Sequence, residues 1–349
     1  MYWQRYERWQ GVGDCGKLKN MGLDSIAAKD TFVRRNWVKV QAPARLHLGF
    51  LDPSGWLGRK FGSVGVALEM LATEIEITPA QTLTVTGQDT QRVIKVTRKL
   101  LDQLELPDQV CIHVTASIPP HVGLGSGTQL ALGVGAALMR FWGQGLDVRR
   151  IACLSGRGER SGIGIAAFER GGFVVDGGRG EVTITPPLLC RLPVPEDWHW
   201  LLVFDDWSEG LSGRRELLAF QKLPPFPREA AADLCHRLLI QGLPALAEER
   251  FEEFCACLAT IQQANGEYFT PVQRGRYASP LVASALAWLQ EQGWTGLGQS
   301  SWGPTGFCLL PDRETACQVK EGLEANFVGT SLRFQIVRSR NTGATILEG

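Results

Sequence analysis

The chain has 349 residues, of which 44% are hydrophobic and 21% are charged, a balance typical of a globular enzyme with a substantial core. Lysine plus arginine and aspartate plus glutamate number 36 each, so the net charge is zero. These values argue against general binding to nucleic acid or to a membrane surface, because both need an excess of basic residues.

The nine cysteines include no C-x-x-C pair, so we expect free thiols in a reducing compartment. The N-terminus lacks the charged-then-apolar pattern of a secretion signal, and no apolar run approaches the ~20 residues of a membrane helix. The sequence therefore predicts a cytoplasmic protein. It leaves the oligomeric state open and is compatible with a homodimer.

Residues 1–36 mix Trp, Arg, Gly and Lys without clear periodicity. We interpret them as an N-terminal extension, either disordered or a partner-binding arm, with Met21 as an alternative start. Strand patterns follow in VKVQAPARLHLGF, which Pro43 interrupts, and in GSVGVALEM and TEIEITP. Residues 93–104 have apolar side chains at helical spacing, and residues 110–117 read as a strand.

The segment IPPHVGLGSGTQLALGVGAALMRFW comes next: two prolines end the strand, glycines form a loop, and an apolar helix of small residues begins. Asp147 is the expected cap of a helix over residues 148–154. The later predicted elements are strands FVVDGG and VTITPP, a buried strand at 198–205, a helical stretch at 228–263 broken near Gly242 and Pro244, helices at 283–290 and 314–326, and strands GFCLL and LRFQIV. Because helices and strands alternate without regular βαβ spacing, we favour an α+β fold.

The glycine-rich loop is the most informative feature for function. Glycine lets the backbone turn sharply and approach a ligand, and a helix N-terminus presents unpaired N–H groups and positive charge. The two together favour a phosphate or pyrophosphate site. The alternative is a plain tight turn between strand and helix. The predicted phosphate-binding residues are Val122, Gly123, Leu124, Gly125, Ser126, Gly127 and Thr128.

Three motifs in this order resemble those of the GHMP kinases. They are APARLHLGFLD at 42–52, PPHVGLGSGTQLALG around the loop, and GQSSWGPTGF at 298–307. The resemblance implies a GHMP kinase-like α+β fold. Its N-terminal domain, at 37–190, resembles domain 2 of ribosomal protein S5 and carries the phosphate loop. A C-terminal α/β sandwich domain follows at 191–349.

Two positions depart from the kinase pattern. Gly127 stands where the kinase loop usually has a second serine, which helps to hold the nucleotide phosphates and metal. Gly164, in RSGIGIAAFERGGFVVDGG, stands where several family kinases place a catalytic aspartate. A glycine can neither accept a proton nor bind a metal through its side chain. These departures weaken the expectation of kinase activity.

The segments RKFGSVGVALE, GRGERSGIGIAAFERGGFVVDGG and NGEYFTPVQRGRYASP are similar to one branch, the β-ribofuranosylaminobenzene 5′-phosphate synthases. That resemblance implies a pentosyltransferase that joins 4-aminobenzoate or 4-hydroxybenzoate to phosphoribosyl pyrophosphate, with loss of CO₂ and pyrophosphate. Mg²⁺ would assist, and the product would serve the synthesis of methanopterin-type one-carbon carriers. The alternatives are an ATP-dependent small-molecule kinase of the same fold and a non-catalytic binder.

Several polar residues are candidates for the site. Arg45 and His47 lie two apart in a strand pattern, so they share a face and could reach substrate anions, or form a surface pair. Asp205 and Asp206 follow a buried strand and could hold Mg²⁺ or act as a helix cap or turn.

The substrate-binding candidates are Arg157, Arg160, Ser161, Gly162, Arg170, Ser300, Ser301 and Trp302. Weaker candidates are Arg214, Glu216, Tyr268, Phe269 and Gln273. His113 is expected to be structural. Because His199 and His236 have no ligand-spaced partner, no zinc site is expected and the metal ligands stay unassigned.

Overall fold

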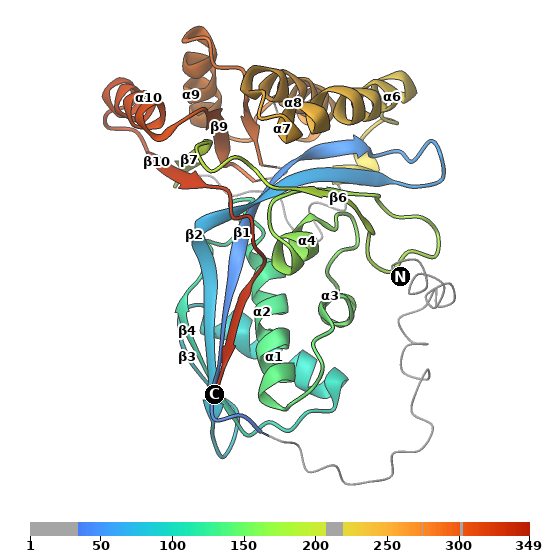
Figure 1. Cartoon of the computed structure of the whole chain (residues 1–349), viewed down its shortest axis with the longest axis vertical. Helices are drawn as coiled ribbons and strands as arrows, with labels where there is room; N and C mark the ends of the chain where they lie inside the picture. Colours follow the sequence, from blue (N-terminus) through green and yellow to red (C-terminus); the bar gives the residue numbers. More distant parts are fainter. Residues whose placement is uncertain (1–33, 207–218, 274, 301–302) are drawn as a thin grey trace.

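The computed structural model describes residues 34–206, 219–273, 275–300 and 303–349, so most of the expected N-terminal extension lies outside it. The described chain forms two β-sheets with helices packed around them (Figure 1). No helix within these residues is both long and apolar enough to cross a membrane.

The first sheet is built on a long hairpin of β1 (Val38–Asp52) and β2 (Phe61–Pro79). β1 continues through Pro43, and the register shifts between Pro43 and Arg45 and again between His47 and Gly49. The other strands of this sheet are β3 (Thr84–Gly87), β4 (Val110–Ala116), β5 (Phe173–Asp176), β6 (Leu188–Leu192) and β11 (Thr345–Glu348). Their order is β11-β1-β2-β4-β3, with β5 paired to β2 and β6 to β5.

Four helices lie beside the lower part of this sheet in Figure 1: α1 (Thr90–Leu104), α2 (Ser126–Phe141), α3 (Val148–Ser155) and α4 (Ile163–Glu169). α2 is apolar nearly all round because it is buried between the sheet and its neighbouring helices. Its small residues allow this close packing, since a Cβ on Gly133 would lie 2.9 Å from Ile75 Cδ1. The expected cap of α3 is confirmed: the Asp147 carboxylate accepts a hydrogen bond from the Arg150 N–H at 2.9 Å.

The second sheet has the order β10-β7-β9-β8 and is antiparallel. Its strands are β7 (His199–Asp205), β8 (Leu297–Gln299), β9 (Gly306–Leu310) and β10 (Leu332–Arg338). The helices that gather at the top of Figure 1 are α6 (Arg228–Arg237), the π-helix η4 (Leu238–Gly242), α7 (Leu243–Ala247), α8 (Phe251–Gln273), α9 (Pro280–Glu291) and α10 (Arg313–Asn326). The predicted buried strand is confirmed as β7, whose seven residues are all buried.

The two halves of the chain are interleaved at its C-terminus. The boundary expected after residue 190 falls inside β6, which still belongs to the first sheet. β11 also returns to the first sheet, where it pairs with β1 (Figure 1). LRFQIV is therefore not the last strand, and the end of the chain belongs with the N-terminal half.

Three other expectations are wrong in detail. VTITPP is not a strand, and the strand forms just after it, as β6. The helical stretch from 228 continues through Gly242 as a π-helix and breaks after Ala247 instead, where Glu249 has a φ of 59°. Seven of the described cysteines are free thiols, whereas Cys153 is disulfide-bonded.

Candidate active site

The glycine loop leads directly into α2, as the sequence predicts. Its backbone is left-handed at His121, Gly123 and Gly125, with φ values of 61°, 89° and 82°. Gly125 is the N-cap residue of α2, and a side chain would be strained there. The first N–H groups of α2 have no acceptor within the helix and lie at the positive end of its dipole. This loop geometry is suited to an anion.

Two arginines lie against the glycines of this loop. The Arg45 guanidinium donates a hydrogen bond to the Gly123 carbonyl, and a Cβ on Gly125 would lie 3.2 Å from Arg45 Cγ. The backbone N–H of Arg45 donates to the Leu124 carbonyl at 3.1 Å. A Cβ on Gly127 would lie 3.1 Å from both terminal nitrogens of Arg157. Gly127, one of the two departures from the kinase pattern, thus leaves room for a guanidinium at the start of α2.

Arg157 is a half-buried cation that forms no ion pair with the described residues. Its Nε is buried without a hydrogen-bond partner among the described residues. Burial lowers the pKa of Arg157, and the charges of Arg92 and Arg160 lower it further, although Glu159 opposes them. The guanidinium stays protonated, because its ordinary pKa is far above neutral. Positive charge therefore accumulates beside the N-terminus of α2.

The backbone of the third motif, residues 298–307, packs directly on the backbone of the glycine loop. A Cβ on Gly123 would lie 2.6 Å from the Ser300 carbonyl, and one on Gly303 would overlap Gly123 itself. The Ser300 hydroxyl donates to the Gly123 carbonyl at 2.8 Å and accepts from the His47 N–H at 3.1 Å. The Thr305 hydroxyl donates to the Val122 carbonyl at 2.7 Å. All three motifs that the sequence singled out therefore meet at this loop.

Gly164 also lies next to the start of α2. It belongs to α4, and a Cβ on it would lie 3.0 Å from Thr128 Cγ2. The Gln129 side-chain amide donates to the Gly164 carbonyl at 2.8 Å, which fixes α4 against the first turn of α2. A side chain at this position would require Thr128 to shift.

Ser161 and Gly162 are held by a buried carboxylate. Asp176 Oδ2 accepts from the Gly162 N–H at 2.8 Å and from the Ser161 hydroxyl at 3.2 Å, and Oδ1 accepts from the Gly178 N–H at 2.8 Å. Burial raises the pKa of Asp176, although these hydrogen bonds oppose the shift. Asp176 thus positions the start of α4.

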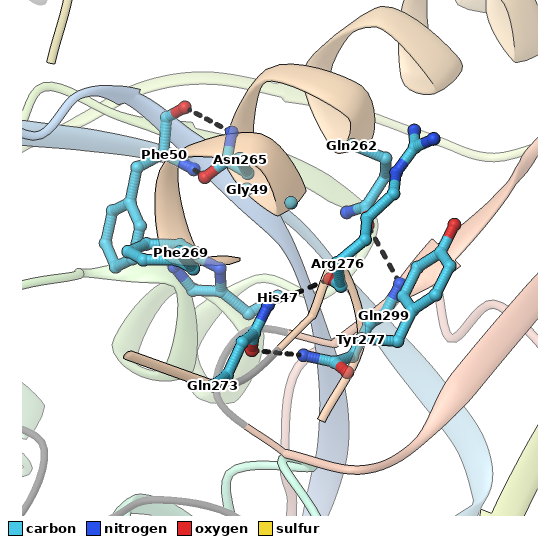
Figure 2. Close-up of a pocket in the computed structure, with 11 residues that line it drawn as sticks. His47, Gly49, Phe50, Gln262, Asn265, Phe269, Gln273, Arg276, Tyr277 and Gln299 are labelled. Atoms are coloured by element: carbon cyan, nitrogen blue, oxygen red, sulfur yellow. Dashed lines mark hydrogen bonds between the residues drawn. The ribbon is translucent and has the colours of Figure 1, made fainter. Parts of the chain in front are cut away.

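A small cavity, which we call the His47 cavity, lies between β1, α8 and β8 (Figure 2). Its volume is about 20 Å³. It is lined by His47, Gly49, Phe50, Gln262, Asn265, Gly266, Phe269, Gln273, Arg276, Tyr277 and Gln299. Because the backbone of His47 bonds to Ser300 and Ser300 bonds to the glycine loop, the cavity adjoins that loop.

The remaining candidates lie in other surroundings. Both carboxylate oxygens of Asp205 accept hydrogen bonds from hydroxyls, of Ser279 at 2.6 Å and of Ser331 at 2.7 Å. Asp206 is exposed and lies 3.7 Å from Arg333. Arg170 is exposed at the C-terminal end of α4, the end opposite Gly162.

Of the weaker candidates, some line the His47 cavity and others lie elsewhere. Phe269 and Gln273 line the His47 cavity, whereas the Tyr268 ring packs on Phe226 with 5.0 Å between ring centroids. His113 is exposed and bonds to Thr86, which suits the structural role expected for it. Ser301, Trp302, Arg214 and Glu216 lie outside the described residues.

No group of three or more His, Cys, Asp or Glu side chains within the described residues could hold a metal ion. GHMP superfamily enzymes typically use Mg²⁺. The two facts are compatible, because Mg²⁺ at phosphate sites takes most of its ligands from the substrate phosphates and water.

Sequence reasoning missed Asp176, Gln262, Asn265 and Arg276. Three of the four pair with backbone groups of other elements: Asp176 with Gly162, Gln262 with Leu48, and Asn265 with Phe50. Asp176, Asn265 and Arg276 lie in segments that resemble the synthase branch, but nothing local in the sequence indicates these contacts.

Comparison with known proteins agrees with this geometry. The GHMP kinases N terminal domain model matches residues 91–172, and the GHMP kinases C terminal model matches residues 243–329. The galactokinase of Lactococcus lactis has a similar structure, with a TM-score of 0.65 at 13% identity over 88% of this chain and 95% of its own. The fold and the glycine loop are thus those of the GHMP kinase superfamily.

Two curated relatives are more similar in sequence. The β-ribofuranosylphenol 5′-phosphate synthase of Archaeoglobus fulgidus is 32% identical over 88% of this chain and 99% of its own length. The enzyme of that name from Methanothermobacter thermautotrophicus is 28% identical over 88% of this chain and 98% of its own. Within the superfamily, the chain belongs to the β-ribofuranosylphenol 5′-phosphate synthase family.

Proposed function

We propose that this protein condenses phosphoribosyl pyrophosphate with 4-hydroxybenzoate or 4-aminobenzoate, and that CO₂ and pyrophosphate are released. The product is a β-ribofuranosylbenzene 5′-phosphate of the kind implied by the family name. Methanopterin-type one-carbon carriers are its expected destination. The observation that carries the proposal is the glycine loop with Arg45 on Gly125 and Arg157 on Gly127.

This loop suits a pyrophosphate leaving group. Breaking the bond between ribose C1 and the pyrophosphate oxygen moves negative charge onto the leaving group and leaves an oxocarbenium-like ribose. Preorganised donors stabilise such charge best when they are in place before the reaction. The first N–H groups of α2 and the Arg157 guanidinium are held at this loop by packing, and the Arg45 side chain lies against Gly125 beside them. Mg²⁺ bound to the pyrophosphate oxygens would supply further charge neutralisation.

The acceptor needs little help from the protein. The ring carbon that bears the carboxylate attacks ribose C1, and the new C–C bond leaves the ring as a non-aromatic cation. The bond to the carboxylate then breaks, its electron pair restores aromaticity, and CO₂ leaves. Since no proton is removed from the attacking carbon, the reaction is consistent with a glycine at position 164. The main demand is for orientation of the two substrates.

The test is incubation of the purified protein with phosphoribosyl pyrophosphate, Mg²⁺ and each acid, followed by mass analysis of the product. We expect a C-riboside with the mass of the ring plus ribose phosphate and without the carboxylate. A parallel incubation with ATP and a panel of alcohols should form no ADP above background. ADP formation with an alcohol, and no C-riboside with either acid, would instead support the kinase alternative.

A further inference from the structure

His47 is a buried histidine in β1. Its side chain is 2% exposed, and neither ring nitrogen has a hydrogen-bond partner on any other described residue. Burial of a polar group without a partner costs free energy, so such groups are rare in native proteins. The ring lines the His47 cavity (Figure 2). A ligand in this cavity would be the natural partner of these nitrogens.

Most of the other polar groups around the cavity are already paired within the fold. Gln262 donates to the Leu48 carbonyl and accepts from the Gln299 N–H, and Asn265 exchanges two bonds with the Phe50 backbone (Figure 2). The Arg276 guanidinium makes no ion pair within the described residues and lies over the Tyr277 ring at 5.7 Å. A ligand would therefore meet one neutral imidazole and one cation.

Part of the cavity wall is aromatic. The Phe50 ring lies 4.5 Å from the His47 ring and 6.2 Å from the Phe269 ring, centroid to centroid. The present volume of about 20 Å³ is too small for a benzene ring, which occupies cavities of roughly 150 Å³. The exposed Arg276 lines the cavity and packs on Gly266, since its Cγ would lie 2.7 Å from a Cβ there. Displacement of this flexible side chain would enlarge the cavity.

We propose that the His47 cavity receives the aromatic acid, with His47 bonded to the polar group para to the carboxylate and Arg276 paired with the carboxylate. This inference rests on the proposed function. The orientation follows from burial, because a carboxylate costs far more to bury than a neutral hydroxyl or amino group. The carboxylate therefore stays at the exposed cation, and the para group points to the buried imidazole.

This orientation also fits the reaction. The attacking ring carbon bears the carboxylate, so it lies at the open side of the cavity. When that carbon attacks, positive charge develops on the para oxygen or nitrogen. A neutral imidazole accepts a hydrogen bond from that group, and the bond strengthens as the charge grows. His47 would thus select para-hydroxy and para-amino acids and stabilise the charge that forms on them.

The experiment uses calorimetry to measure how tightly the protein binds 4-hydroxybenzoate, 4-aminobenzoate and unsubstituted benzoate. The wild-type protein should bind each substituted acid at least ~10-fold more tightly than benzoate, the equivalent of one good buried hydrogen bond. His47→Phe should bring that ratio to about one while benzoate still binds. His47→Gln, which keeps an acceptor, should retain part of the preference. Arg276→Ala should weaken the binding of all three acids.

His113→Ala is the matched control, because His113 is exposed and lies outside the cavity. The KM for phosphoribosyl pyrophosphate should stay within two-fold in the His47 variants. A wild-type protein without preference, or a folded His47→Phe protein that keeps the whole preference, would overturn the assignment. Wild-type protein that binds the acids with this preference, but forms no C-riboside, would contradict the proposed function and leave the cavity assignment standing.

Discussion

Gly127 and Arg157 form the contact that most clearly separates this loop from a kinase loop. Gly127 lies in the first turn of α2 with ordinary helical geometry, so glycine is not needed here for the backbone conformation. The lack of a side chain instead leaves space beside the helix. The space is taken by the two terminal nitrogens of Arg157. A hydroxyl that could contact nucleotide phosphate and metal is replaced here by a half-buried cation.

Gly127→Ala is predicted to separate binding from stability. Alanine is favoured over glycine in a helix by up to about 1 kcal/mol, so the free energy of unfolding should not fall. The added Cβ displaces Arg157, and the KM for phosphoribosyl pyrophosphate should rise about 10-fold, as for loss of one charge-assisted hydrogen bond. Because both changes remove one contact, Gly127→Ala combined with Arg157→Ala should cost little more than Arg157→Ala alone. Additive effects would place Arg157 outside the anion site.

His47 is predicted to make stability depend on pH. Burial lowers its pKa well below the usual 6.5, and the charge of Arg45 lowers it further, so the folded protein keeps His47 neutral where the unfolded chain binds a proton. Stability should therefore fall as the pH drops below about 6.5, by about 1.4 kcal/mol per pH unit until the folded-state pKa is reached. Urea unfolding from pH 7 to 5 measures this slope, which His47→Gln should lack. Equal slopes in the two proteins would contradict a neutral buried His47.

At the scale of elements, the contact between α2 and α4 explains the glycine at 164. An aspartate there would push against Thr128 and would place a carboxylate among buried groups. Gly164→Asp should lower the free energy of unfolding by about 2–4 kcal/mol and form no ADP from ATP with any alcohol. Gly164→Ala, which adds the Cβ alone, is the control and should lose less stability. A stable Gly164→Asp protein with kinase activity would show that only the base was missing.

Local patterns predicted most of the elements in this structure. α2, the Asp147 cap and β7 follow from periodicity, side-chain capping and burial, which are properties of neighbouring residues. β11 could not be predicted, because its four residues form a strand only by pairing with β1 some 300 positions away. The position of the helix break, after Ala247, could not be predicted either. Gly242 and Pro244 usually interrupt helices, but here the π-helix and α7 accommodate them.

At the scale of the whole molecule, the site exists only where distant segments meet. The sequence picked out Arg45 and His47 by strand spacing, the glycine loop by its backbone chemistry and Ser300 by its motif, and the structure brings these segments into contact. The cavity beside them was not predictable. Its walls come from β1, α8 and β8, and the pairing of Gln262 and Asn265 with the β1 backbone has no local signature.

The Ser300 hydroxyl connects the third motif to the first two. Ser300→Ala should leave the buried N–H of His47 without its acceptor and cost about 1–3 kcal/mol of stability. Since the Gly123 carbonyl also loses a donor, the loop should be held less firmly and the KM for phosphoribosyl pyrophosphate should rise. Ser284→Ala is a suitable control, because Ser284 is exposed and bonds only within its own helix. An unchanged KM in a measurably destabilised Ser300→Ala protein would confine this hydroxyl to a structural role.

In the proposed reaction, C–C bond formation and loss of CO₂ are coupled on one enzyme. The most direct measurement uses 4-hydroxybenzoate or 4-aminobenzoate labelled at the carboxyl carbon, with phosphoribosyl pyrophosphate and Mg²⁺. Labelled CO₂ and pyrophosphate should appear in equal amounts, and only when both substrates are present. Pyrophosphate release with the label retained in the product, or labelled CO₂ without the ribose donor, would contradict the account.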